Sequence, residues 1–264
     1  REMNTKLMKV YEDLTFQSSL ENDVKRENAN IDGDTAMGTM LKYGSEGAKQ
    51  FYEMFILDPA HAKAHREGDI HIHDLDFLTL TTTCCQIDLL QLFSGGFSTG
   101  HGFLREPNDI RSYSALACIA IQSNQNDQHG GQSVPNFDYS MAPGVKKTFR
   151  KLFRDNLAKA LEVYGADENN EVDAAALTER LERQTGKWAC LAGRNGYDEA
   201  LTAALGENLG TEAAAKCVRF ARKYADKETR KATYQAMEAL IHNLNTMHSR
   251  AGAQTPFSSI NYGM

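Results

Sequence analysis

The sequence predicts an α/β protein that is mainly helical and contains a few strands. Three observations lead to this prediction: apolar residues recur at helical spacing over long stretches, one stretch is rich in β-branched residues, and the composition is balanced. The chain has 264 residues, of which 41% are hydrophobic and 24% are charged. These proportions are typical of a globular protein with a proper core, and they exclude a disordered chain or a coiled-coil rod.

The first part of the chain is expected to be helical. Residues 3–20 carry apolar side chains at helical spacing, and a polar loop follows at 27–34. A second helix is expected over about 35–57, with a break near Gly44. A third is expected over 58–68, because an Asp-Pro pair starts it and a glycine ends it.

Strands are expected in the middle of the chain and at its end. Residues 69–74 alternate between polar and apolar, and residues 79–93 are rich in β-branched side chains. A glycine-rich loop follows at 95–102, and residues 256–262 have the pattern of a last short strand.

The second half is expected to return to helices. The apolar pattern predicts helices at about 108–125 and 145–164, an acidic connector at 165–173, and three or four helices over 174–250. The length allows one large domain or two small ones, and the sequence shows no internal repeat or low-complexity linker. The chain begins with Arg and stops just after a strand-like run, so we expect a piece of a longer protein.

The net charge, the hydropathy and the cysteine content exclude several classes of protein. A net charge of −6 and a pI near 5.8 argue against a nucleic-acid binder. No apolar run approaches the roughly 18 residues of a membrane span, and no signal peptide opens the chain. The few cysteines, without a CxxC motif, are typical of reduced thiols, so we expect a cytoplasmic protein with no metal site in these residues. They are Cys84, Cys85, Cys118, Cys190 and Cys217.

The neighbouring residues Cys84 and Cys85 are the main candidates for chemistry. If residues 82–90 form a strand, adjacent side chains point to opposite faces. Cys84 then shares a polar face with Gln86 and would line an interior site, while Cys85 shares an apolar face and would pack against helices. The alternative is that both are small buried side chains without a function.

Two histidine pairs and one serine motif suggest other chemistry. His61 and His65 are one helical turn apart, and His71 and His73 are two apart on an expected strand, so each pair could bind a metal. Neither pair has an identifiable third ligand. Ser98 lies in a GxSxG sequence, the motif of a hydrolase nucleophile, but glycines and a proline follow where a helix should begin.

The helix expected at 145–164 carries five basic residues on its non-core side. Such a face is usually only solvated, but it also suits a phosphate or nucleotide site. The basic residues are Lys146, Lys147, Arg150, Lys151 and Arg154.

Six runs of sequence, taken together in their order and spacing, resemble the anaerobic (class III) ribonucleoside-triphosphate reductases. The resemblance spans nearly the whole chain. The runs are ENAN at 27–30, HIHDLD at 71–76, CCQIDL at 84–89, QHGGQS at 128–133, MAPGV at 141–145 and PFSSINYG at 256–263.

The resemblance implies a glycyl-radical enzyme whose fold is a ten-stranded α/β barrel. Residues 1–264 would then form a single partial domain, the first half of this barrel with its surrounding helices. In that family a glycyl radical passes to a loop cysteine, whose thiyl radical removes the 3′ hydrogen of a ribonucleoside triphosphate. A second cysteine, on an early strand, donates hydrogen at the 2′ position. Cys84 matches this second cysteine. For substrate binding the resemblance suggests His71, His73, Thr83 and Ser258.

The resemblance also implies partners and cofactors. These are formate as reductant, ATP, dATP and deoxynucleotides as allosteric effectors, a radical-SAM activase, and a homodimer or higher oligomer. Lys151 matches an effector-binding lysine, with Arg150 and Arg105 as further candidates.

Some family parts have no match in these residues. They are the ATP-cone, the glycyl-radical segment, its zinc module and the thiyl cysteine, since Cys118, Cys190 and Cys217 all lie in expected helices. We therefore expect the chain alone to be inactive. The alternatives are a hydrolase using Ser98 or a histidine-bound metal, and a non-catalytic helical module that binds an anion or a partner.

Overall fold

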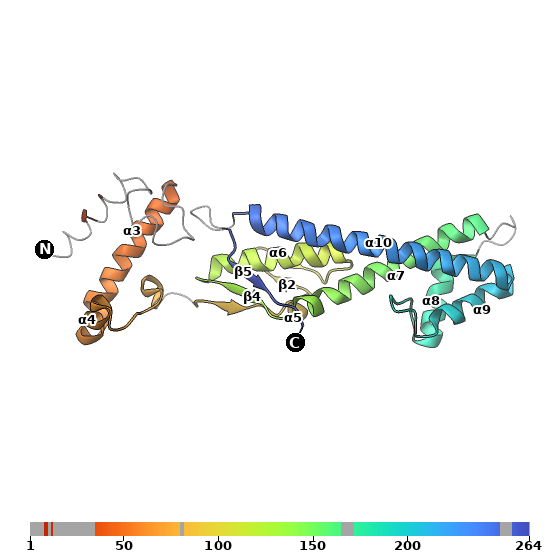
Figure 1. The fold of residues 1–264 in the computed structure, drawn as a ribbon, viewed down its shortest axis with the longest axis horizontal. Helices are drawn as coiled ribbons and strands as arrows, with labels where there is room; N and C mark the ends of the chain where they lie inside the picture. Colours follow the sequence, from red (N-terminus) through yellow and green to blue (C-terminus); the bar gives the residue numbers. More distant parts are fainter. Residues whose placement is uncertain are drawn as a thin grey trace. The chain divides into compact units, whose positions relative to one another are not determined.

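Three short strands form a parallel sheet in the computed structural model, and helices make up most of the rest (Figure 1). The structure describes residues 8–9, 12, 35–79, 82–164, 172–248 and 255–263. The helix expected at 3–20, the loop at 27–34 and most of the connector at 165–173 lie outside these residues. The mixed α/β class, mainly helical with a few strands, is confirmed.

The chain divides into two compact units. Unit 1 consists of Arg1–Asp88, Cys118–Pro135 and His242–Asn261. Unit 2 consists of Leu89–Ala117, Asn136–Ile241 and Tyr262–Met264. The expectation of one domain stays a prediction, and each unit is described by itself below.

Unit 1 contains helix α3 (Ala36–Phe51), which begins where the Thr35 side chain accepts a hydrogen bond from the Gly38 N–H at 3.0 Å. The predicted break near Gly44 is wrong, because the helix runs through this residue. A π-helical turn, η1 (Tyr52–Ile56), extends α3 before the chain leaves the helix at Leu57.

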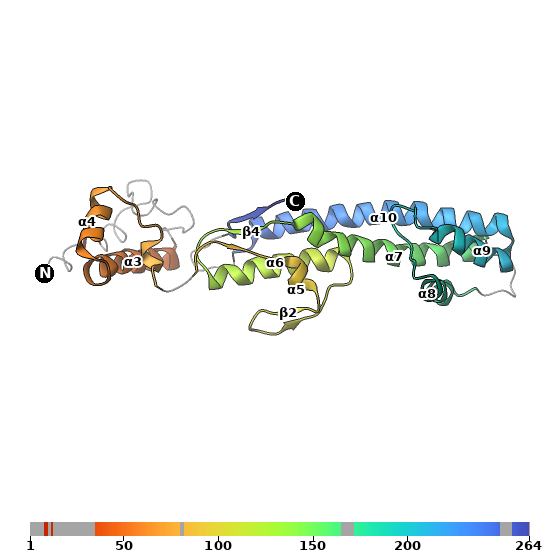
Figure 2. The same ribbon diagram turned by 90° about the horizontal axis from the view of Figure 1, so that it is seen from below.

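Helix α4 (Pro59–Glu67) confirms its predicted signals. The Asp58 carboxylate accepts the Ala60 N–H at 2.8 Å, and Pro59 lacks the N–H that a first turn leaves unsatisfied. Gly68 ends the helix with a φ of 83°, a left-handed conformation that glycine adopts without strain. Figure 2 shows α4 at the end of α3.

The strand predicted at 69–74 is wrong. The His65 Nδ1 accepts the Ile72 N–H at 3.2 Å, which ties this segment to α4 instead of to a sheet. Asp74 then adopts a left-handed conformation with φ 49°, which is incompatible with a strand, and the short 3₁₀ helix η2 (Leu75–Phe77) follows.

The strand predicted over 79–93 is present only as β1 (Cys85–Gln86), and helix α5 (Leu89–Phe93) replaces its end. β1 pairs in parallel with β4 (Gln132–Val134), which pairs in parallel with β5 (Ser258–Ile260). β5 confirms the strand predicted near the chain end. Pairing aligns Cys85 with Gln132 and Gln132 with Ser258.

Unit 2 is built around two long helices. The helices predicted at 108–125 and 145–164 are confirmed as α6 (Ile110–Asp127) and α7 (Phe137–Tyr164), although α7 begins earlier and continues through Pro143. Three helices follow, within the predicted number: α8 (Ala174–Thr185), α9 (Tyr197–Leu209) and α10 (Thr211–Thr246). Residues of α6 and α10 belong to both units.

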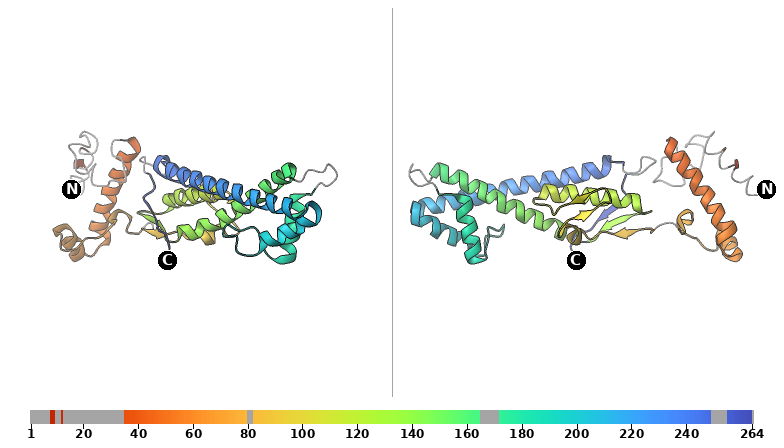
Figure 3. Two further views of the ribbon diagram at one scale, coloured as in Figure 1. Left: turned by 45° about the vertical axis from the view of Figure 1, so that its right-hand side comes forward. Right: turned by 180° about the vertical axis from the view of Figure 1, so that it is seen from behind.

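The core of unit 2 lies where α7, α8, α9 and α10 meet. Phe149, Phe153 and Leu157 of α7 are almost fully buried there against Leu201, Cys217 and other side chains. Figure 3 shows α8 crossing α7 in this region. Cys217 lies in α10 and Cys118 in α6, as predicted, but Cys190 lies in the loop between α8 and α9 and not in a helix.

Within the described residues, none of the helices combines the length and apolar character that crossing a membrane requires.

Candidate functional site

The cysteine pair lies at the start of β1, and its two residues have different surroundings. Cys84 is exposed and Cys85 is half-buried. The Cys85 sulfur accepts a hydrogen bond from the Asn124 side-chain amide of α6 at 2.9 Å. Burial alternates through the next residues, because Gln86 is exposed and Ile87 is buried. The sulfur of Cys85 therefore faces α6, as the alternation of side chains predicts, while Cys84 lies open.

The strand register shows which residues of β4 and β5 share a face of the sheet with Cys85. Cys85, Gln132 and Ser258 are aligned, so their side chains point to one face. This is the face of α6, because Asn124 also donates to the Gln132 side-chain oxygen at 2.7 Å. The Ser258 hydroxyl oxygen is buried and has no hydrogen-bond partner among the described residues.

The opposite face of the sheet, which we call the open face, carries Gln86, Ser133 and Ser259. Gln86 and Ser259 are exposed and Ser133 is half-buried. The two serines were missed at the level of sequence, since only the pairing register distinguishes Ser259 from Ser258. The role of Ser258 in substrate binding stays a prediction, but its hydroxyl points away from this face.

The predicted substrate-binding residues before the sheet are exposed. Thr83 directly precedes Cys84, and His71 and His73 lie in the link that follows α4. The His73 Nε2 lies 3.2 Å from one carboxylate oxygen of Asp74, while the other oxygen lies 3.2 Å from His129 Nε2. Their substrate contacts stay predictions.

Neither hydrolase alternative gains support. Ser98 lies in a two-stranded antiparallel hairpin of β2 (Phe97–Ser98) and β3 (Phe103–Leu104), where its hydroxyl accepts the Gly100 N–H at 3.2 Å. A nucleophile elbow needs a strand that turns directly into a helix. Among the residues that the structure describes, no three His, Cys, Asp or Glu side chains are grouped to hold a metal ion.

A pocket of about 510 Å³ in unit 2 includes Lys151, the predicted effector-binding lysine. α6, α7 and α10 supply its walls. Arg111 and Lys231 add positive charge, and Asp109 and Glu228 add negative charge. Burial raises the pKa of Asp109, but hydrogen bonds from Ser112 and the nearby cations outweigh burial and lower this pKa below its usual value. The three cations outnumber the two carboxylates, so the lining of the pocket carries a small excess of positive charge.

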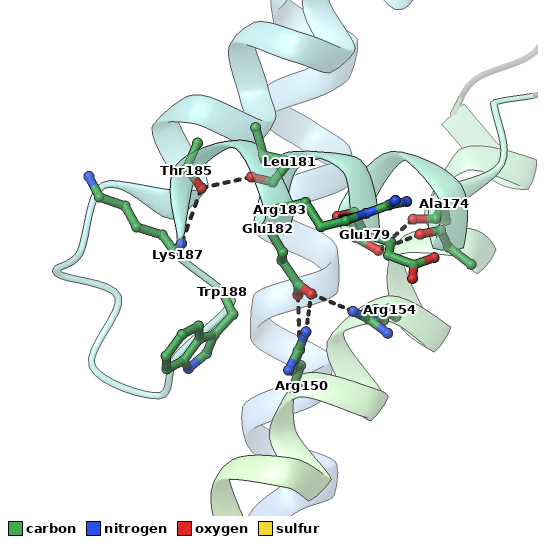
Figure 4. A network of polar contacts seen from close by, with 12 residues as sticks. Arg150, Arg154, Ala174, Glu179, Leu181, Glu182, Arg183, Thr185, Lys187 and Trp188 are labelled. Carbon is green, nitrogen blue, oxygen red and sulfur yellow. Dashed lines mark hydrogen bonds and ion pairs between the residues drawn. The ribbon is translucent and has the colours of Figure 1, made fainter.

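The other two predicted effector residues do not line this pocket. The Arg150 guanidinium forms a double contact with the Glu182 carboxylate of α8, which Arg154 also contacts at 2.6 Å (Figure 4). The hydrogen bond that the Arg150 guanidinium donates to Glu182 outweighs burial and raises the pKa of Arg150. Arg105 is exposed in the link after β3. Their roles in effector binding stay predictions.

Comparison with known proteins identifies the family. Residues 27–264 match the family model of the anaerobic ribonucleoside-triphosphate reductases. Relatives with this name come from enterobacteria phage T4, 26% identical over 91% of this chain and 30% of the relative, and from Escherichia coli, 24% identical over 90% and 26%. One from Haemophilus influenzae is 29% identical over 57% of this chain and 21% of its own length. The chain thus spans about a quarter to a third of the phage and Escherichia coli relatives, and it belongs to the anaerobic ribonucleoside-triphosphate reductase family.

Proposed function

We propose that this chain forms the first part of the catalytic core of an enzyme that reduces ribonucleoside triphosphates to deoxyribonucleotides, with Cys84 as hydrogen donor. The observation that carries the proposal is the different placement of the two cysteines. The Cys85 sulfur is held by Asn124, while Cys84 is exposed where β1 begins. A donor must reach the substrate, and Cys84 meets this requirement.

The sheet supports the barrel as part of this proposal. β1, β4 and β5 are parallel, as the strands of an α/β barrel half are. α6 belongs to the chain between β1 and β4, and it covers one face of the sheet through Asn124. Within the described residues β1 and β5 are the edges of the sheet. Further strands would add to these edges, and the open face would then line the barrel interior.

The residues of this chain would act on the ribose at the open face. A glycyl radical held elsewhere in the complete protein would supply the oxidising radical. The Cys84 thiol would donate its hydrogen at the 2′ carbon. Gln86, Ser133 and Ser259 would supply polar contacts, together with the predicted residues His71, His73 and Thr83.

The remaining parts of the function belong to the same proposal. Formate would be the overall reductant, and a radical-SAM activase would generate the radical. Zinc would be bound only in a C-terminal part. The enzyme would be a cytoplasmic homodimer or higher oligomer that binds no nucleic acid directly. A deoxynucleotide effector would bind at the Lys151 pocket, since this pocket places cations from three helices around one cavity.

The test is the Cys84→Ala variant of the complete protein, assayed with its activase. We expect deoxynucleotide formation to be abolished, because no hydrogen is available at this position, while the glycyl radical still forms and is seen by electron paramagnetic resonance. Cys190→Ala, a half-buried cysteine in a loop of unit 2, serves as the matched control and should keep full turnover. Undiminished turnover of Cys84→Ala would remove this residue from the mechanism.

A further inference from the structure

A carboxylate–imidazole pair with little exposure, formed by Asp74 and His129, lies in unit 1. The Asp74 Oδ1 is 3.2 Å from the His129 Nε2, and the two side chains are only 15% and 12% exposed. The His129 ring also stacks on Phe77, with 4.0 Å between ring centroids and an interplanar angle of 19°. Burial of a polar group destabilises the folded protein unless the group has a partner, so each of these side chains holds the other in place.

The backbone at Asp74 is strained in a way that serves this pair. Asp74 is the one non-glycine residue with positive φ among the residues that the structure describes. The left-handed conformation is unfavourable for most L-residues, although Asp and Asn adopt it more readily than others. The turn directs the carboxylate toward His129, which lies 55 residues later in the sequence.

The segment from His129 to Gly131 runs directly along the cysteine pair. The His129 N–H donates to the Thr82 carbonyl at 3.0 Å, and the Cys85 N–H donates to the Gly131 carbonyl at 3.2 Å. Between them, Gly130 has a φ of 96°, and a Cβ atom there would lie 3.1 Å from the Cys84 sulfur. The Gly130 backbone therefore lies close to the Cys84 sulfur and forms a wall that limits the position of the thiol on this side.

We propose that Asp74 and His129 are positioning residues for the Cys84 thiol. The pair anchors one end of the segment that carries Gly130, and Gly130 limits where the sulfur can lie. Neither side chain is assigned a contact with the substrate or a proton-transfer step. The proposal rests on the proposed function, in which the position of this sulfur relative to the ribose decides the rate of hydrogen donation.

The direct test measures the position of the thiol without catalysis. In the complete protein, under anaerobic conditions, the rate of Cys84 alkylation by iodoacetamide is followed by peptide mass spectrometry, with Cys190 as internal reference. We expect Asp74→Gly and His129→Ala to raise the Cys84 rate about threefold or more, because the wall loses its anchor. Asp74→Gly keeps the left-handed backbone accessible, so its effect reports the carboxylate and not strain.

Conservative variants keep the test decisive where the first variants fold poorly. Asp74→Asn retains a side-chain oxygen as acceptor and tolerates the left-handed conformation. His129→Gln retains a side-chain N–H that can donate to Asp74. Both are expected to keep the Cys84 alkylation rate within about twofold of the wild type. His61→Ala, an exposed histidine of α4, is the control for general effects of histidine loss.

Turnover gives the second readout. A displaced thiol is badly placed for hydrogen transfer, but substrate binding is not weakened. In His129→Ala we therefore expect kcat to fall about tenfold while KM changes less than about twofold. Glycyl-radical yield should be unchanged. Wild-type alkylation and wild-type kcat in folded Asp74→Gly and His129→Ala would overturn the positioning role. Turnover by Cys84→Ala would instead overturn the proposed function, while the alkylation rates would still report on the pair.

Discussion

Tyr197 shows how a single buried hydroxyl affects stability. Its side chain is 1% exposed, and the hydroxyl oxygen has no hydrogen-bond partner among the described residues. Burial, together with the negative charge of Glu182, raises the pKa of this phenol above its usual value. A raised folded-state pKa means that the neutral form is favoured in the native protein.

The first prediction concerns Tyr197→Phe. At neutral pH we expect the free energy of unfolding to stay equal or rise by up to about 1 kcal/mol, because the lost hydroxyl is buried without a partner. As pH rises above the unfolded-state pKa near 10, the wild type must lose stability, since only the unfolded state releases the proton. The variant should lose less over this range. Urea unfolding between pH 8 and pH 11 measures both effects, and an equal alkaline loss in the variant would contradict the prediction.

Gly144 is required for close packing between α6 and α7. A Cβ atom at this position would lie 2.7 Å from the Tyr113 ring, and Tyr113 is a buried side chain that is 3% exposed. By contrast, Gly44 of α3 has nothing within 4 Å of the same atom. The two helical glycines thus differ in the packing that an added methyl group would meet.

The second prediction compares these positions. Gly144→Ala should lower the free energy of unfolding by about 1–3 kcal/mol through overpacking. Gly44→Ala should raise it by roughly 0.5–1 kcal/mol, because alanine loses less conformational freedom than glycine in a helix interior. Thermal unfolding followed by circular dichroism measures both changes. Equal effects at the two sites would show that Tyr113 does not confine Gly144.

At the scale of elements, Glu182 joins α8 to α7. Its side chain is 7% exposed and accepts hydrogen bonds from Arg150 and Arg154, which are partly exposed. The contact is visible in Figure 4, where both guanidinium groups converge on one carboxylate. One buried carboxylate of α8 therefore accepts from two donors of α7 and links the two helices at this point.

The third prediction is that Glu182→Gln destabilises unit 2 by about 1–3 kcal/mol, since both guanidinium groups lose their charged acceptor. Glu179→Gln, a change of the same chemistry at an exposed position of α8, is the matched control and should have little effect. Denaturant unfolding of the complete protein, with the signal of the exposed Trp188 as a local probe, measures the difference. Identical stability of the two variants would contradict this role.

At the scale of the whole molecule, effector binding would couple a pocket in unit 2 to folding stability. A ligand that binds only the native state stabilises it by about 2.7 kcal/mol at a hundred times its Kd. Within the proposed function, the pocket at Lys151 is the site where a deoxynucleotide would produce this effect.

The fourth prediction is that deoxynucleoside triphosphates raise the melting temperature of the complete protein, and that Lys151→Ala loses most of this shift. Lys146→Ala, an exposed lysine of the same helix outside the pocket, should keep it. Arg150→Ala is informative too. If it lowers the melting temperature but leaves the nucleotide shift intact, its contact with Glu182 is structural and its effector role is wrong. Equal shifts in the wild type and Lys151→Ala would remove Lys151 from effector binding.

Local patterns in the sequence were sufficient to predict the features that depend on neighbouring residues. Local geometry predicts the Asp-Pro start and the glycine end of α4, and it predicts the long helices. It also predicts the alternation of side chains that separates Cys84 from Cys85. The prediction of a strand at 69–74 was wrong, because an alternating pattern assumes a neighbouring strand as partner. Here the segment instead forms a hydrogen bond to His65, and Asp74 adopts a left-handed conformation.

Contacts between residues far apart in the chain could be seen only in the folded protein. Two such contacts are the pairs of Asp74 with His129 and of Arg150 with Glu182. A third is the strand register that turns Ser258 toward α6 and leaves Ser259 on the open face. A local pattern cannot specify such contacts, because a sheet register or an ion pair depends on the path of all the chain between its partners.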